Sequence, residues 1–396
     1  MTLPATTDVV IIGGGVMGAS CAYHLALKGC RNVVLLERNR LFGSEATGKC
    51  AGGIRYQFDT EINIRLSILS LPMLERFEEE LGQAIDVRKC GYLFVLTREE
   101  DVVEFKRQVR LQNSLGVNTQ WIDGDELRRR LPLMQYPDAL GGTWGPEDGL
   151  ADPNGVVQGY ISGARRLGVR CLTDAEVTAI RVSAGQVRGV ETQQGFIETP
   201  LVVNAAGPWA GQVGALAGVD VPVMPVRRQI AVTTPIPSLP PDFPFVIEFA
   251  RSLYFHREGL GLLSGMSNHD EPASFNQGLD SDWELVHFEA ACQRMPGLEC
   301  AGVAGRWAGL YENTPDAHPI LGAVEELSGF YCIAGFSGHG FMHGPICGLL
   351  LAEEILEAQA STLDISPLRL NRFRAGGTGR HSEMGRHPMT REYNVV

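Results

Sequence analysis

The first forty residues most constrain what this chain can fold into. An apolar segment, 8–12, leads into Gly-Gly-Gly-Val-Met-Gly over 13–18, which opens a helical segment, and a second apolar segment, 32–36, ends on Glu37. A strand, a Gly-x-Gly-x-x-Gly turn, a helix and a strand tipped by an acid are typical of a dinucleotide-binding unit. The glycines allow a tight turn close to a pyrophosphate, the helix N-terminus favours its charge, and the acid suits ribose hydroxyls. We therefore predict that the chain binds an adenine dinucleotide.

Length and composition limit the class of protein. A chain of 396 residues, 44% hydrophobic and 20% charged, is long enough for two domains. The net charge of −12 disfavours nucleic acid or an anionic membrane as a partner. The longest polar-poor run, 202–219, contains Asn204 and Pro208, so we expect no membrane span. Nine cysteines without Cys-x-x-Cys pairs, and no signal-like segment before the first strand, favour a cytoplasmic protein. We find no metal-ligand spacing and predict no metal.

Two later segments, 203–209 and 335–341, distinguish between the dinucleotides. The first, Val-Asn-Ala-Ala-Gly-Pro-Trp, follows an apolar strand with small residues, and the second, Gly-Phe-Ser-Gly-His-Gly-Phe, leads to a helix that we expect to open near Gly344. Such a turn directs backbone N–H groups and the positive end of a helix at a bound group. A reduced flavin carries negative charge at N1 and the C2 carbonyl, which this arrangement stabilises, whereas a nicotinamide has no such need. We therefore predict FAD rather than NAD.

Several motifs together point to one protein family. In order along the chain they are 13–18, 43–55, 203–209, 312–322 and 335–341. From about residue 8 to 372 the chain resembles the D-amino-acid-oxidase-like FAD oxidoreductases. Within that family it is most similar to the β subunit of sarcosine oxidase and the FAD subunit of L-proline dehydrogenase complexes. The resemblance implies an α/β fold in which a Rossmann-like FAD-binding domain carries an inserted substrate domain of mixed β-sheet and helices.

The family fold implies domains that are discontinuous in sequence. We expect an FAD-binding domain of residues 1–88, 146–216 and 303–373, and a substrate domain of residues 89–145 and 217–302. Within the first domain, 61–81 has helical periodicity, with a kink expected at Pro72. The segment 374–396 is rich in Gly, Arg and His without apolar periodicity, so we predict a flexible tail.

The resemblance also implies which residues bind the cofactor, and these include the glycines and the acid of the first motif. The predicted cofactor-binding residues are Gly13, Gly15, Val16, Met17, Gly18, Glu37, Arg38, Ser44, Thr47, Gly48, Lys49, Gly52, Gly53, Ile54, Val177, Ala205, Ala206, Gly207, Trp209, Arg306, Gly335, Ser337, Gly338, His339, Gly340, Phe341 and Met342.

The segment 44–55 resembles the stretch that passes beneath the flavin ring in this family. Its small residues let the backbone approach a planar ring, and we expect Arg55 to hold a positive charge near flavin N5, which favours hydride arrival. The alternative for Arg55 is a surface or ion-paired arginine. We expect Cys50 to be a small buried residue beside the cofactor and not a redox group.

Histidines supply the other acid–base candidates. His339 lies in the turn at the expected flavin edge, and His256 lies on the expected strand 253–257, where Tyr254 shares its face by period-two alternation. We take Arg55, His339 and His256 as the candidate catalytic residues. For both histidines the alternative is packing inside the protein with satisfied ring nitrogens.

Three positions depart from the single-subunit sarcosine oxidases. Gly309 stands where those enzymes attach FAD through a cysteine, so we expect FAD to be non-covalent. Met342 replaces a lysine that helps to hold the substrate carboxylate, and our alignment places Leu263 where a lysine activates oxygen. Because oxygen reduction without that positive charge is poorly stabilised, we expect a dehydrogenase rather than an oxidase.

The resemblance implies FAD-dependent oxidation of an amino-acid C–N bond. Hydride would pass from the carbon next to nitrogen to flavin N5, and water would hydrolyse the resulting imine. The expected substrates are N-methyl or imino acids such as sarcosine or proline. A catalytic chain that needs partner subunits or a separate electron acceptor, and a flavin-binding subunit or assembly protein with little catalysis of its own, remain alternatives.

Overall fold

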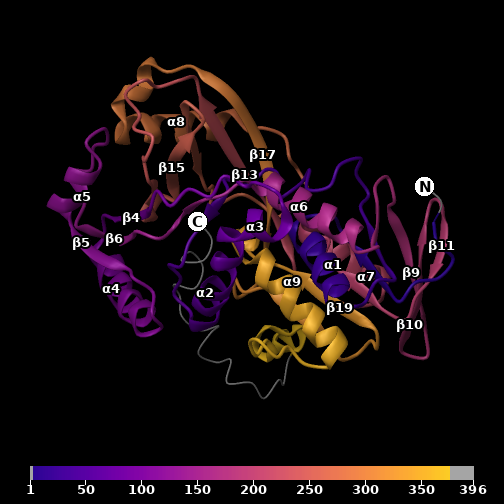
Figure 1. The fold of residues 1–396 in the computed structure, drawn as a ribbon. Coiled ribbons are helices and arrows are strands. Elements are labelled where there is room, and N and C mark those ends of the chain that lie inside the picture. The colour runs from indigo at the N-terminus through magenta and orange to yellow at the C-terminus, as the bar shows by residue number, and fades with distance from the viewer. Residues whose placement is uncertain (1–2, 375–396) are drawn as a thin grey trace.

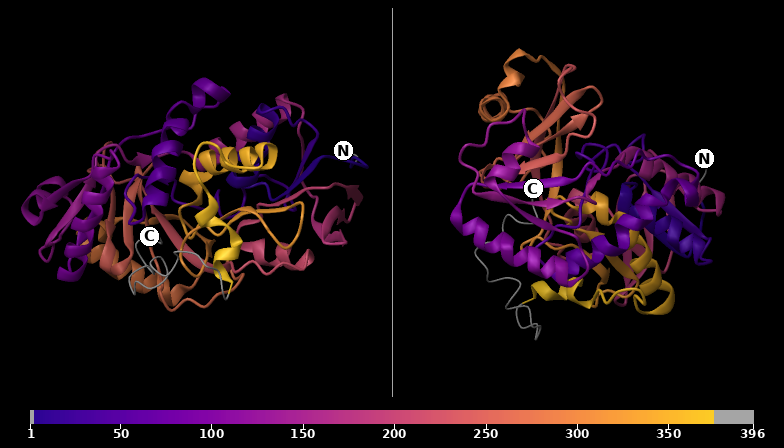
Figure 2. Two further views of the ribbon diagram at one scale, coloured as in Figure 1. Left: turned by 90° about the horizontal axis from the view of Figure 1, so that it is seen from below. Right: turned by 60° about the vertical axis from the view of Figure 1, so that its left-hand side comes forward.

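The computed structural model describes residues 3–374, so the predicted flexible tail lies outside the described residues except for Arg374. The protein has the expected α/β fold. Two main sheets occupy separate parts of the molecule, and segments of both alternate along the chain (Figure 1, Figure 2).

The first main sheet contains the predicted dinucleotide-binding unit. Its six strands run in the order β18-β19-β12-β1-β2-β8, and all neighbours are parallel except β18 and β19. They are β1 (Val9–Ile12), β2 (Val33–Leu36), β8 (Arg170–Leu172), β12 (Val202–Asn204), β18 (Ile320–Ala323) and β19 (Phe330–Ala334). Every residue of β1, β2 and β12 is buried, as expected for parallel strands covered on both faces.

Helices cover one face of this sheet, and a small meander covers the other together with the helix Ala210–Leu216 (Figure 1). The helices of this part are α1 (Val16–Leu27), α2 (Glu61–Glu75), α3 (Phe77–Leu81), α6 (Pro153–Arg166), α7 (Ala210–Leu216) and α9 (Gly340–Glu357). The meander consists of β9 (Val177–Ser183), β10 (Gln186–Thr192) and β11 (Gly195–Glu198). Val9 and Ile11 of β1 pack with the helices, whereas Val10 and Ile12 pack with the meander.

Two helices differ in detail from the sequence expectations. The helix expected over 61–81 continues through Pro72 and breaks at Arg76, because the buried Leu71 and Leu74 hold the proline turn in the core. Helix α9 begins at Gly340 and not near Gly344. Phe341, Met342 and His343 pack in the interior, which holds this extra turn ahead of the internal proline.

The second main sheet is mixed and contains eight strands, in the order β17-β13-β16-β15-β14-β4-β6-β5. Only β14 and β4 are parallel neighbours. Its strands are β4 (Tyr92–Leu96), β5 (Gln120–Asp123), β6 (Gly141–Gly145), β13 (Met224–Thr233), β14 (Phe245–Glu248), β15 (Leu253–Glu258), β16 (Gly261–Met266) and β17 (Val303–Asn313). Its helices are α4 (Glu99–Ser114), α5 (Gly124–Arg130) and α8 (Ser281–Arg294).

A short two-stranded sheet, β3 (Gly53–Ile54) with β7 (Gly149–Leu150), completes the described strands. The domain limits given in the sequence analysis stay predictions. None of the helices within residues 3–374 combines the length and the apolar composition that a membrane span requires.

Candidate functional site

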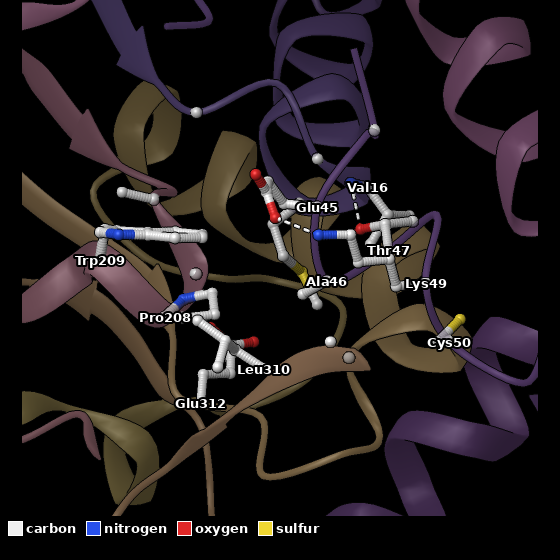
Figure 3. A pocket seen from close by; sticks show the side chains of 18 of the residues that line it. Val16, Glu45, Ala46, Thr47, Lys49, Cys50, Pro208, Trp209, Leu310 and Glu312 are labelled. Carbon is white, nitrogen blue, oxygen red and sulfur yellow. Dashed lines mark hydrogen bonds and ion pairs between the residues drawn. The ribbon is translucent and has the colours of Figure 1, made fainter. Parts of the chain in front are cut away.

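A cavity of about 500 Å³ lies between the two main sheets (Figure 3). Its walls come from segments that are far apart in sequence: the β1–α1 turn, 36–53, 205–216, the start of α9, and the strands β4, β13, β14, β15 and β17. Most of the predicted cofactor-binding residues line it. They are Gly13, Gly15, Val16, Met17, Glu37, Arg38, Ser44, Thr47, Lys49, Gly52, Gly53, Val177, Ala205, Ala206, Gly207, Trp209, Gly338, Gly340, Phe341 and Met342.

The remaining predicted residues are not among the lining residues: Gly18, Gly48, Ile54, Arg306, Gly335, Ser337 and His339, with the catalytic candidates Arg55 and His256. Some of them shape the walls from behind. A Cβ atom on Gly18 would lie 1.9 Å from the carbonyl oxygen of Gly13, so only glycine fits there. Arg306 instead pairs with Glu284 of α8 at 2.7 Å.

The β1–α1 turn is built for close approach of a ligand to the backbone. Gly13 has φ +112°, and a Cβ atom there would lie 2.4 Å from the carbonyl oxygen of Ala205. Gly15 precedes α1 and provides no side-chain cap, while the N–H of Val16 donates to Thr47 Oγ1 at 3.2 Å. This helix N-terminus therefore presents its positive end to the cavity, where a pyrophosphate would be favoured.

Glu37 closes the same end of the cavity. Its Oε2 accepts from the N–H of Gly14 and its Oε1 accepts from the N–H of Asn39, both at 2.8 Å. Burial raises the pKa of its carboxyl, and these two backbone bonds oppose the rise. Each oxygen keeps a further acceptor position for a hydroxyl group. The arrangement suits a ribose at this end of the cavity.

Aromatic and cationic side chains stack beside Glu37. The guanidinium of Arg38 lies 3.8 Å from the ring centroid of Trp209, which in turn stacks on Phe275 at 5.7 Å. Phe275 lies in the segment 267–280, which connects β16 to α8 and thus comes from the second main sheet. The segment also reaches the first part of the molecule through Gln277, which hydrogen-bonds Lys49.

Tyrosines and one arginine line the other end of the cavity. Tyr92 and Phe245 stack with their centroids 4.2 Å apart, and Tyr254 and Tyr311 are close to Arg228. Burial raises the pKa of each of the three tyrosines, so their hydroxyl groups stay neutral at ordinary pH. Only Tyr254 was singled out from the sequence.

Arg228 is the half-buried cation at this end. It hydrogen-bonds the carbonyl oxygens of Arg227 at 2.9 Å and Asn268 at 3.5 Å, and its Nε has no hydrogen-bond partner among the described residues. The nearby Glu271 is bound by Arg227 at 3.0 Å. Burial lowers the pKa of the Arg228 guanidinium. Among the described residues its hydrogen bonds go to carbonyl groups, so this half-buried cation suits an anion.

The sequence analysis missed Arg228, although a signal was present. Arg227 and Arg228 are consecutive in β13, and consecutive strand residues point to opposite faces of a sheet. The two arginines therefore face opposite sides of the sheet, and Arg228 is the one that faces the cavity.

Arg55 is 2% exposed, so the surface alternative is wrong. Its Nη1 donates to the carbonyl oxygen of Gln57 at 2.9 Å, and the guanidinium lies 4.3 Å from the ring centroid of Phe58. Burial lowers the pKa of Arg55, with opposing effects from neighbours that include Tyr92 and Tyr311. Because these two tyrosines line the cavity, the charge of Arg55 lies one layer behind the wall. Its catalytic role stays a prediction.

His339 and His343 form a buried chain of hydrogen bonds. His339 Nε2 lies 3.3 Å from the carbonyl oxygen of Ala317, the two Nδ1 atoms are 3.1 Å apart, and His343 Nε2 lies 2.9 Å from Ser67 Oγ. Since a carbonyl only accepts, His339 donates from Nε2, His343 donates from Nδ1, and Ser67 donates to His343. Burial lowers the pKa of His339 to about 3, so the pair is neutral.

His256 is buried next to the cavity wall. Its Nδ1 lies 3.0 Å from the carbonyl oxygen of Arg257, and its ring packs 5.0 Å from that of Phe245, which Tyr254 also contacts. Burial lowers its pKa to about 4. The shared face with Tyr254 is thus as expected, but the His256 side chain is not part of the cavity lining. Its catalytic role stays a prediction.

A sequence model described as "DAO: FAD dependent oxidoreductase" matches residues 8–354. The chain belongs to this family. The family's cofactor, FAD, fits the cavity. The turn at Gly13 leaves no room for a side chain, and Glu37 faces one end of the cavity. Arg228 and Glu312 line the cavity, and each has a polar atom without a hydrogen-bond partner among the described residues. Figure 3 shows Glu312, Pro208 and Trp209 on one side of the cavity and Val16 and Thr47 on the other.

Relatives in the FAD-dependent oxidoreductase family include human mitochondrial sarcosine dehydrogenase, which is 34% identical over 98% of this chain and 43% of its own length. Rat mitochondrial dimethylglycine dehydrogenase is 32% identical over 95% of this chain and 46% of its own length. The chain thus spans less than half the length of these relatives.

Solved structures match over nearly their whole length. L-proline dehydrogenase from P. horikoshii has a TM-score of 0.85 and 32% identity, with 92% of this chain and 96% of that chain covered. Glycine oxidase from Geobacillus kaustophilus has a TM-score of 0.84 and 25% identity, with 94% and 100% covered. These two structures therefore share the arrangement of both main sheets with this chain.

Proposed function

We propose that the protein is an FAD-dependent dehydrogenase that oxidises the C–N bond of an N-methyl amino acid or an imino acid, with sarcosine and proline as the leading candidates. Its relatives include dehydrogenases named for sarcosine, dimethylglycine and L-proline. These substrates share a carboxylate and a neighbouring amine nitrogen.

Arg228 is the observation that carries the proposal. An amino-acid substrate brings a carboxylate into a largely apolar pocket, where that charge needs a fixed cation. Arg228 is such a cation: it lines the cavity, it is half-buried, and its Nε has no hydrogen-bond partner within residues 3–374. It would take the place of the lysine that Met342 replaces.

The surroundings of Arg228 also favour the reactive form of the substrate. A positive charge in a buried site disfavours an ammonium group beside it, so the bound amine loses its proton more readily. The neutral Tyr254 and Tyr311 leave that charge uncompensated while they enclose the substrate. FAD, when bound, would supply the hydride acceptor at N5. The nitrogen lone pair then forms the C=N bond, and water hydrolyses the imine.

Leu263 supports a dehydrogenase rather than an oxidase. It lies in β16 inside an apolar cluster with Ile230 and Tyr254. A neutral side chain at this place does not stabilise negative charge on reduced oxygen. We expect reoxidation of the reduced protein to be faster with an artificial electron acceptor than with oxygen.

A substrate screen with the purified yellow protein tests the activity. Anaerobic addition of sarcosine, dimethylglycine, L-proline, glycine and D-amino acids is followed by flavin absorbance. We expect bleaching by at least one secondary or tertiary amino acid. If none of these compounds bleaches the flavin, the proposed activity is wrong.

Replacing Arg228 with Met tests how the substrate is recognised. The variant keeps the apolar stem and should lower kcat/KM at least 100-fold, about 3 kcal/mol, mainly through KM. Arg306→Met is the matched control, because Arg306 is an arginine in the adjacent strand that pairs with Glu284 outside the cavity. An unchanged KM in Arg228→Met would show that another group binds the carboxylate.

A further inference from the structure

Glu312 is a buried acid in β17 whose carboxylate is only partly satisfied by the protein. The backbone N–H groups of Gly335 and Phe336 hydrogen-bond the carboxylate. Its Oε2 has no hydrogen-bond partner among the residues that the structure describes. A buried carboxylate oxygen without a donor is costly, so this atom points to a ligand group that donates.

The side chain lies on one wall of the cavity. It is a lining residue beside Pro208 and Leu310, across from the start of α1 (Figure 3). A Cβ atom on Gly207 would lie 3.4 Å from Glu312 Oε2, so the carboxylate stands against the turn 205–207. Glu37 lies at one end of the cavity and Arg228 at the other.

The position restricts which part of FAD could meet this carboxylate. The pyrophosphate is anionic and is favoured at the start of α1, on the opposite wall, so it would be repelled by Glu312. The isoalloxazine fits the end that Tyr92, Tyr254 and Arg228 line. Between these two parts of FAD lies the ribityl chain, which carries hydroxyl groups that can donate to a carboxylate.

We propose that Glu312 binds a hydroxyl group of the ribityl chain of FAD. Gly335 and Phe336 hold one side of the carboxylate in place, and Oε2 accepts a hydrogen bond from the hydroxyl group. Burial raises the pKa of Glu312 to about 7, and a donating hydroxyl would favour the ionised form. The proposal rests on FAD as the cofactor and is independent of which amino acid is oxidised.

The test compares the affinities of FAD and ADP for apoprotein, because ADP contains the adenosine and the pyrophosphate but not the ribityl chain. Glu312→Leu should weaken FAD about tenfold and leave ADP unchanged. Glu312→Gln should stay within about threefold of the parent for both, since its amide still bonds a hydroxyl. Unfolding temperatures of the apoproteins check that each variant is folded.

Three outcomes would overturn the proposal. Unchanged FAD affinity in Glu312→Leu would mean that no contact is lost. Tighter binding of both ADP and FAD would place the carboxylate near the phosphates, and equal weakening of both would reveal a change in the fold.

FAD analogues that lack single ribityl hydroxyls test the same contact without relying on a variant. The parent protein should bind at least one of the 2′-, 3′- and 4′-deoxyribityl analogues about tenfold more weakly than FAD. Equal affinity for FAD and all three analogues would also overturn the proposal. Flavin bleaching by substrate reports separately on the proposed activity.

Discussion

The carboxylate of Glu37 joins the β1–α1 turn to the end of β2 through the N–H groups of Gly14 and Asn39. We expect Glu37→Ala to leave both donors unpaired and to remove the acceptor for a ribose. The affinities for ADP and for FAD should each fall by about 1–3 kcal/mol. Titration of apoprotein with both ligands measures this.

Glu45→Ala is the control for Glu37, because it removes another acid that lines the cavity. Glu45 pairs with Lys49 at 2.8 Å and is partly exposed. It should change the affinity for either ligand only slightly. If Glu37→Ala retains FAD as tightly as the parent, Glu37 is not part of the cofactor site.

The residues that could be predicted from the sequence are those whose role is local. Gly13, Gly15 and Glu37 follow from a turn between neighbouring elements, and all three line the cavity. Arg228 and Glu312 could not be placed, because their positions depend on how β13 and β17 pair, from Met224–Asn313 to Thr233–Val303. That register brings together segments far apart in sequence.

At the scale of single elements, α1 carries an unusual buried group. His24 is 5% exposed, and neither ring nitrogen has a hydrogen-bond partner among the described residues. Burial lowers its pKa to about 3. Since the folded pKa lies below that of the unfolded chain, the neutral ring favours folding above about pH 6.5, and this contribution is lost as the pH falls toward 3.

We expect His24→Leu to make the protein less sensitive to acid. At pH 5 the parent should have lost about 2 kcal/mol through His24, and the variant should not show this loss. Chemical unfolding of both proteins at pH 5 and pH 8 measures the difference. The control is His269→Leu, since His269 lies outside this helix in the segment before α8. Parallel pH profiles for parent and His24→Leu would contradict the prediction.

The packing of α9 on α1 depends on small residues. A Cβ atom on Gly348 would lie 2.2 Å from Ser20 Oγ and 2.7 Å from the backbone nitrogen of Cys21. Gly348→Ala should therefore lower the free energy of unfolding by about 1–3 kcal/mol, although alanine favours the helix itself. Gly305→Ala, with no atom near its added Cβ, is the control and should be close to neutral. Equal unfolding midpoints for parent and Gly348→Ala would show that α9 shifts without cost.

The elements themselves were largely predictable, and their ends were less so. The strand, glycine turn, helix and second strand at the N-terminus have the expected order. The start of α9 was misplaced because Pro345 suggests a helix beginning just before it, whereas packing of Phe341 and Met342 in the interior extends the helix. Local preference was outweighed by burial.

At the scale of the whole molecule, the segment 267–280 bridges the two main sheets at the end of the cavity where Glu37 and Trp209 lie. Phe275 stacks on Trp209, and Glu271 anchors the segment to Arg227. We expect Phe275→Ala to remove an aromatic contact worth about 0.5–1.5 kcal/mol and to raise the FAD dissociation rate about two- to tenfold. Recovery of flavin fluorescence after dilution measures the rate.

Phe196→Ala is the matched control for Phe275, because Phe196 is a similarly exposed phenylalanine in β11. It should not change the dissociation rate. If Phe275→Ala releases FAD no faster than this control, the bridging segment does not retain the cofactor.

The order of the strands in the first main sheet has a consequence for how the protein is made. β1 is translated long before its partner strand β12, in which Val202 lies opposite Val10. The turn at 338–342, which completes the cavity, is translated later still. A ribosome-bound chain that stops before this turn therefore lacks one wall of the FAD site, and β1 has an unpaired edge until β12 emerges. Capture of the cofactor therefore has to wait until residues 338–342 have emerged, long after β1, and flavin supply would act from that point on.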